Sequence, residues 1–126
     1  MLATRRTKAL GVLAIVSLLA ITLVLYRSHT RCTVKNAMLV QQVDALSKEA
    51  NEQLRMGSEK PDVLRFFETH NMHVRFANGQ ASGSLRASGC MSGCDSLARI
   101  EVSVPVDTQG TVDGQPHVSA AYVDCI

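Results

Sequence analysis

At 126 residues with a formal charge of +2, the chain is long enough for one small domain. Three cations, Arg5, Arg6 and Lys8, precede the apolar residues 9–26, and all eleven acidic residues follow them. From Ala37 onward seven Lys and Arg stand against eleven Asp and Glu. This mildly acidic balance excludes nucleic acid as a partner, because phosphate binding requires clustered cations.

Residues 9–26 form an apolar segment that contains no charged residue. It consists of Leu, Val, Ile and Ala with a closing Tyr, and its only interruptions are Gly11, Ser17 and Thr22. At about 1.5 Å per residue, a helix of this length covers about 27 Å, close to the hydrocarbon thickness of a bilayer. The segment predicts a transmembrane signal-anchor helix over residues 9–26, which holds the protein in the lipid bilayer, preceded by a short cytoplasmic tail over residues 1–8.

Two other kinds of N-terminal segment share this pattern. A cleaved signal peptide has an apolar region of about 7 to 15 residues and a small-x-small cleavage site, and no such triplet follows Tyr26. A lipoprotein anchor requires a small residue before the lipidated cysteine, where Arg31 precedes Cys32. An uncleaved anchor is therefore favoured.

The orientation of the anchor does not follow from charge, because the cations before the apolar segment are matched by Arg27, Arg31 and Lys35 after it. A domain this small with four cysteines favours an oxidising compartment, in which disulfides persist. We expect a single-pass protein of the cell inner membrane with its C-terminal domain in the periplasm.

Residues 27–35 predict a polar juxtamembrane linker, and residues 36–126 predict the ectodomain. Apolar residues then recur at steps of three and four, which indicates one stripe of an amphipathic helix: Leu39, Val43, Leu46, Ala50 and Leu54. The same stripe would suit a coiled-coil seam, but it is shorter than the three to four heptads that such a seam requires.

A second amphipathic helix is predicted after Gly57. Ser58 is placed to cap it, since serine oxygens accept hydrogen bonds from the unpaired N–H groups of a first helical turn. Proline and acidic residues suit that turn, and His70-Asn71 marks the end of the helix. The predicted buried face comprises Val63, Leu64, Phe66 and Phe67.

The remaining sequence alternates with a period of two and predicts about four strands. Residues 72–76 form the first, Asn78-Gly79 a type I′ hairpin turn, and residues 81–87 a return strand with small side chains. Residues 98–106 give the clearest strand, and residues 117–125 the last. The fold class is α+β: one N-terminal transmembrane helix, then two amphipathic helices packed on an antiparallel sheet.

The segment Cys90-Met-Ser-Gly-Cys94 is the strongest chemical signal in the sequence, and three interpretations compete for it. A hairpin between residues 97–105 and 117–125 would bring Cys125 near Cys94 or Cys90, which predicts a structural disulfide. Two thiolates with the Met91 thioether and His117 would suit monovalent copper in a copper or thiol-redox carrier. Free thiols are the third interpretation.

Cys32 lies directly after the apolar segment. It can bridge to the cysteine that Cys125 leaves, link to a second chain in a homodimer, or form no bridge. His70 and His73 are a weaker metal hypothesis, since a helix end and a strand start need not bring them together. No Ser-nucleophile, Walker or dinucleotide motif is present, so the sequence predicts no enzyme, no cofactor and no metal.

The segment Leu54-Arg-Met-Gly-Ser-Glu-Lys-Pro-Asp-Val-Leu-Arg-Phe-Phe resembles the start of small bacterial envelope domains. These include the small lipoprotein of the outer-membrane barrel assembly machinery and domains similar to β-lactamase-inhibitor repeats, which share a helix-helix-sheet plan. The chain departs from that lipoprotein in lacking its lipid-attachment cysteine, and is more similar to uncharacterised inner-membrane-anchored envelope proteins of Gram-negative bacteria. The resemblance implies a noncatalytic protein-interaction or accessory module whose protein partner is unknown.

Overall fold

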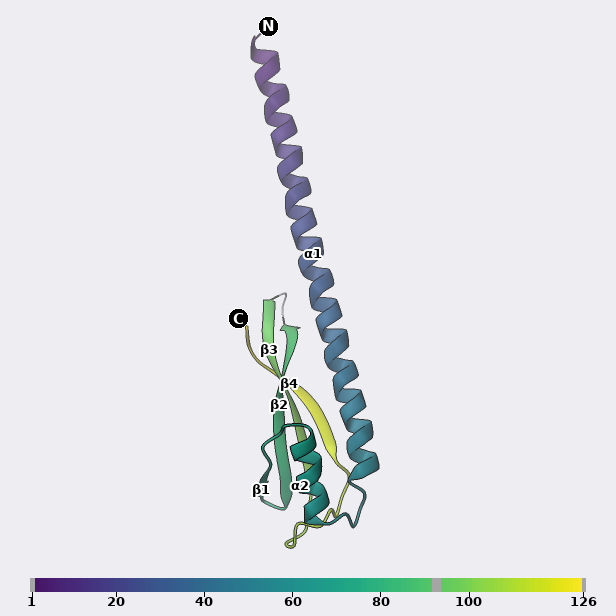
Figure 1. Ribbon diagram of the computed structural model, residues 1–126. Coiled ribbons are helices and arrows are strands. Elements are labelled where there is room, and N and C mark those ends of the chain that lie inside the picture. The colour runs from purple at the N-terminus through teal and green to yellow at the C-terminus, as the bar shows by residue number, and fades with distance from the viewer. Residues whose placement is uncertain (1, 92–93, 126) are drawn as a thin grey trace.

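The computed structural model describes the backbone of residues 2–91 and 94–125 and the side chains of residues 11–90 and 97–123. Figure 1 shows a long helix beside a small sheet with a second, short helix at its far end. The elements in chain order are α1 (Leu2–Gln53), α2 (Lys60–Thr69), β1 (Arg75–Ala77), β2 (Gln80–Met91), β3 (Cys94–Pro105) and β4 (His117–Cys125). Helices and strands are segregated along the chain, so the α+β class is confirmed.

The predicted juxtamembrane linker, residues 27–35, is helical and continues from the apolar segment into the domain. The expected transmembrane helix and the first amphipathic helix are two parts of α1, so the described residues form two helices where three were expected. No Gly or Pro occurs between Gly11 and Gly57 to end the helix. The hydroxyls of Thr30 and Thr33 each donate to a carbonyl three or four residues earlier, at 3.0 Å, so these polar residues are accommodated within the helix.

The apolar part of α1 extends beyond the sheet without touching it (Figure 1). Its side chains are exposed throughout residues 11–26; for example, Val12 is 62% and Tyr26 68% exposed. By length and composition this stretch of α1 is long and apolar enough to cross a membrane. An exposed apolar stretch of this kind is compatible with a single-pass membrane anchor.

The second helix begins one residue later than a Ser58 cap would require. Glu59 occupies the N-cap with extended backbone and makes no side-chain cap bond, so the prediction for Ser58 was wrong. The backbone of Ser58 is used elsewhere, because its carbonyl accepts from the Val112 N–H at 2.9 Å. The predicted end is confirmed, since α2 ends at Thr69 with His70 as C-cap.

The sheet is antiparallel with the strand order β1-β2-β3-β4. Asn78 and Gly79 have φ of 53° and 71°, the positive pair that a type I′ turn requires, so the predicted hairpin is confirmed. β1 is shorter than predicted and covers Arg75–Ala77 only. β2 and β3 are longer than predicted, because β2 continues to Met91 and β3 already begins at Cys94. The β2–β3 hairpin is therefore much longer than its β1 neighbour.

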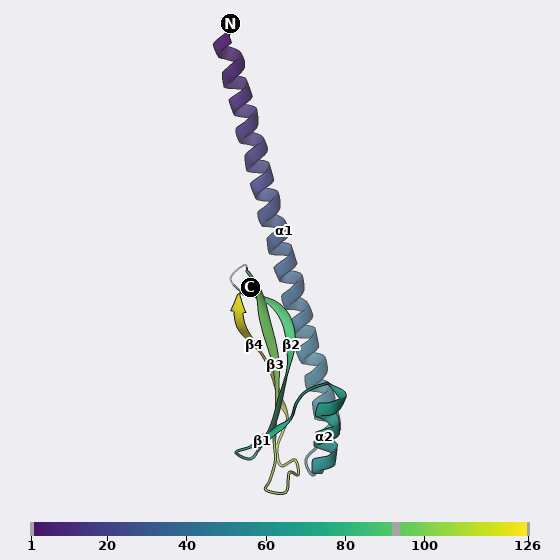
Figure 2. The same ribbon diagram turned by 60° about the vertical axis from the view of Figure 1, so that its left-hand side comes forward.

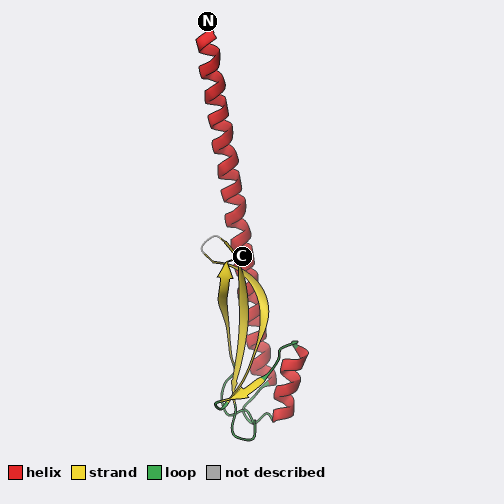
Figure 3. Ribbon diagram, turned by 90° about the vertical axis from the view of Figure 1, so that its left-hand side faces the viewer, coloured by secondary structure: helices red, strands yellow, loops and turns green. Residues whose placement is uncertain are grey.

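Both helices cover the same face of the sheet, on its right in Figure 2. In Figure 3 no helix covers the other face of the sheet, which we call the open face. The helical stripes and the alternation of residues 98–106 are confirmed. The predicted inward side chains that are only half-buried are Val43, Leu64, Val74, Phe76, Leu85 and Ala87. The core comprises Leu39, Leu46, Ala50, Leu54, Val63, Phe66, Phe67, Met72, Ala81, Ala98, Ile100, Val102, Val104, Val106 and Val112.

The small side chains of β2 allow α2 to approach the sheet closely. Phe67 is fully buried, and a Cβ added to Gly83 would lie only 2.6 Å from the Cδ1 atom of its ring. Gly83 has no positive φ, so its role here is close packing and not backbone conformation. This explains why a strand with few large side chains can still support a packed core.

We predict that Gly83→Ala destabilises the domain by about 1–3 kcal/mol, because the added methyl would lie 2.6 Å from the fully buried Phe67 ring and force it to shift. The measurement is chemical unfolding of the full chain in detergent. Ser84→Ala, at the exposed neighbouring position, is the control and should leave the midpoint unchanged. Equal midpoints for Gly83→Ala and the wild type would contradict this packing.

Candidate functional site

A disulfide joins α1 to the sheet, between Cys32 and Cys90, whose Cα atoms lie 5.1 Å apart. Cys32 follows Tyr26 by six residues, which places the bridge about 9 Å along the helix from the end of the apolar segment. Of the three alternatives for Cys32, the structure contains the bridge within the chain.

Asn36 reinforces this attachment one helical turn after the bridge. Its Nδ2 donates to the Cys90 carbonyl at 2.9 Å, and its Oδ1 accepts from the Cys90 N–H at 2.8 Å. The Tyr122 hydroxyl donates to the same Oδ1 at 3.0 Å, so α1, β2 and β4 meet at one side chain. The sequence analysis missed Asn36; its position four residues after Cys32, on the same helix face, was the available signal.

The remaining cysteines, Cys94 and Cys125, have side chains outside the described residues, as does Met91. Their backbone positions agree with the predicted hairpin, because Ser96 pairs with Cys125 and Met91 pairs with Cys94. A Cys94–Cys125 disulfide stays a prediction. A copper site would need Cys90 as a thiolate, whereas here its sulfur is bonded to Cys32.

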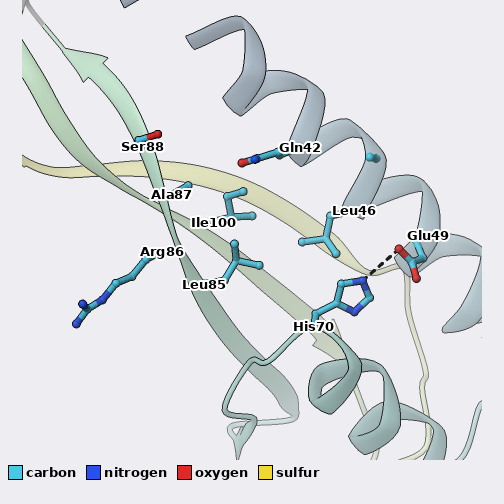
Figure 4. A pocket seen from close by; sticks show the side chains of 10 residues that line it. Gln42, Leu46, Glu49, His70, Leu85, Arg86, Ala87, Ser88 and Ile100 are labelled. Carbon is cyan, nitrogen blue, oxygen red and sulfur yellow. Dashed lines mark hydrogen bonds and ion pairs between the residues drawn. The ribbon is translucent and has the colours of Figure 1, made fainter. Parts of the chain in front are cut away.

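A groove of about 650 Å³ lies between α1 and β2, on the helix side of the sheet (Figure 4). In Figure 4, Leu46 from α1 and Leu85 and Ile100 from the sheet point into it, while Arg86 points away. The groove therefore has an apolar floor and a polar rim. Its lining residues are Gln42, Ala45, Leu46, Glu49, His70, Leu85, Arg86, Ala87, Ser88 and Ile100.

His70 closes one end of this groove. Its Nε2 lies 3.1 Å from Glu49 Oε2, and its Nδ1 lies 2.8 Å from the Phe66 carbonyl. Both contacts are hydrogen bonds at once only when the ring carries both protons, because both oxygens are acceptors. His73 lines a different depression, on the open face, so the two histidines are not brought together. Among the described residues, no group of three or more His, Cys, Asp or Glu is placed to hold a metal.

The groove places apolar side chains beside a strand of the sheet and holds one hydroxyl. Ser88 is the one hydroxyl among its lining residues, and within the described chain no hydrogen bond joins it to the His70–Glu49 pair. A nucleophile activated by a base would need that contact. Apolar surface beside a strand instead offers packing and backbone hydrogen bonds to a polypeptide.

Compared with protein-family models, with curated protein sequences and with solved structures, the chain has no match. The resemblance of the segment from Leu54 to Phe67 to small envelope domains thus stays a prediction.

We predict that replacing both Cys32 and Cys90 by Ser lowers the free energy of unfolding by about 4 kcal/mol, from the entropy of a loop closed over 58 residues. Chemical unfolding of the full chain measures this loss. Thr33→Ser, beside the bridge and exposed, is the matched control. An unchanged midpoint in the double variant would show that the bridge contributes nothing to the domain.

Proposed function

We propose that this protein is a noncatalytic interaction module anchored in the bacterial inner membrane, with its α+β domain held in the periplasm close to the bilayer. The single observation that carries the proposal is the continuity of α1, from an exposed apolar segment of membrane-spanning length into the core of the domain. A helix without a break transmits the position of the anchor to the domain.

The Cys32–Cys90 disulfide supports the compartment. Disulfides persist in the periplasm and are rare in the cytoplasm, where thiols are kept reduced. A domain outside the cytoplasm leaves Arg5, Arg6 and Lys8 on the cytoplasmic side. The disulfide carries this choice, because equal numbers of cations flank the apolar segment and the positive-inside rule favours neither orientation.

Anchoring favours an interaction role because it confines the domain to a surface and raises its effective concentration for membrane-bound partners. The groove between α1 and β2 is the face that we assign to the partner. Its apolar floor of Leu46, Leu85 and Ile100 lies beside exposed polar groups, the composition that protein interfaces share.

The test is site-specific photo-crosslinking of the full chain in intact cells that produce it naturally, followed by isolation of the membrane fraction. A photoreactive residue at Gln42, in the groove, should give a discrete adduct with a second protein, because that position lines the docking face. Probes at Ser119 on the open face and at Leu18 in the apolar segment are the controls.

The possible results separate the parts of the proposal. Adducts from Ser119 and none from Gln42 would support the interaction role but would show that the partner does not bind in the groove. Monomer alone from every probe, or recovery of the chain in the soluble fraction, would contradict the anchored interaction module.

A further inference from the structure

The outer edge of β2 is uncovered over its middle. β3 pairs with β2 along its whole length, but β1 covers the other edge only at Gln80, Ala81 and Ser82. At the far end, the Asn36 amide bonds both backbone groups of Cys90, as a neighbouring strand would. Between these two covered ends lies a free strand edge that runs along the groove.

The alternation of an antiparallel sheet identifies the free groups. Successive residues direct their N–H and C=O groups to opposite neighbours, and those of Cys90 point to Asn36, away from β3. The same direction recurs every second residue, at Ser84, Arg86 and Ser88. In the described part of the chain, no backbone or side-chain group bonds to these outward N–H and C=O groups. They form a template for an added strand.

The groove beside this edge provides the place for the side chains of such a strand. Leu85 and Ala87 alternate with the free residues and face the helix side, together with Leu46. Every second side chain of an added strand would therefore enter an apolar groove of about 650 Å³. The others would lie on the open face.

The charged side chains on the open face indicate which kind of segment would bind at the free edge of β2. Arg86 lies directly opposite Arg99 in the register, and neither forms an ion pair within the described residues. Glu101 pairs with Ser84 and is not within ion-pair distance of either guanidinium. Like charges opposite each other destabilise a sheet, and an Asp or Glu on an added strand next to Arg86 would relieve this.

A second copy of this chain fits poorly. Two β2 edges paired antiparallel about their centres would set Arg86 against Arg86 of the other copy, adding a further like-charge contact. The complementary occupant is an extended segment of another protein, with an acidic residue facing Arg86 and apolar residues on both sides of it.

We propose that β2 binds a partner by strand addition between Ser82 and Cys90, and that it selects an apolar-acidic-apolar sequence through Arg86 and the groove. This inference rests on the proposed interaction role and names the chemistry of the partner.

The test uses the full chain in lipid nanodiscs to select binders from a random peptide library displayed on phage. Selected peptides should carry an acidic residue between two apolar ones. Arg86→Glu should weaken them by about tenfold, and replacing their acidic residue by Lys should restore binding to that variant, because the charge pair is reversed.

A second pair of variants tests the backbone hydrogen bonds between β2 and the peptide. Ser84→Pro removes an outward N–H without breaking the β2–β3 ladder, since proline is tolerated where the N–H of an edge strand faces solvent. It should abolish peptide binding, whereas Ser84→Ala, which keeps the N–H, should not. N-methylation of the peptide amide that faces the edge should give the same loss in the unchanged protein, which covers the case of a Ser84→Pro variant that fails to fold.

Strand addition would be overturned if the selected peptides bind the Ser84→Pro variant as tightly as the unchanged protein and their N-methylated forms bind as tightly as the parent peptides. A selection that yields no peptide would overturn it as well. If Gln42 still crosslinks in cells under either result, the interaction role stands and only the binding mode fails.

Discussion

The attachment of the β2–β3 hairpin to α1 determines where the sheet lies relative to the apolar segment. A covalent bridge from Cys32 and the two amide hydrogen bonds of Asn36 hold Cys90 against the helix. Because α1 has no break between Tyr26 and the core, this attachment point is fixed about 9 Å from the apolar segment. The position of the domain is therefore fixed relative to the apolar segment.

That constraint also orients the candidate site. β2 runs alongside the lower half of α1 in both Figure 1 and Figure 2, so its free edge and the groove follow the direction of the helix. With α1 across a bilayer, a partner segment on this edge would extend away from the membrane surface.

Local patterns in the sequence predicted most elements of the domain. The stripe from Leu39 to Leu54, the alternation of residues 98–106 and the Asn78-Gly79 turn were all sufficient, because each depends on neighbours within a few residues. The continuity of α1 was missed although its signal was present. The polar residues 27–35 suggested a linker, whereas the absence of Gly and Pro between Gly11 and Gly57 favoured one helix.

The candidate site could not be predicted in the same way, because it depends on contacts between distant residues. Cys32 had several possible partners, and only the packing of the hairpin on α1 selects Cys90. The free edge of β2 exists because β1 is short and Asn36 covers the other end, which no periodicity reveals. The groove arises from the spacing between α1 and the small residues of β2. This spacing is a property of the folded chain that no stretch of the sequence shows.

Amide hydrogen exchange of the full chain in a lipid bilayer tests most directly whether the anchor and the domain share one helix. If α1 is continuous, the amides of residues 27–35 exchange slowly, at rates comparable to those of residues 40–50 within the domain. Complete exchange of residues 27–35 at the first time point, while residues 40–50 stay protected, would show a flexible linker and contradict the account.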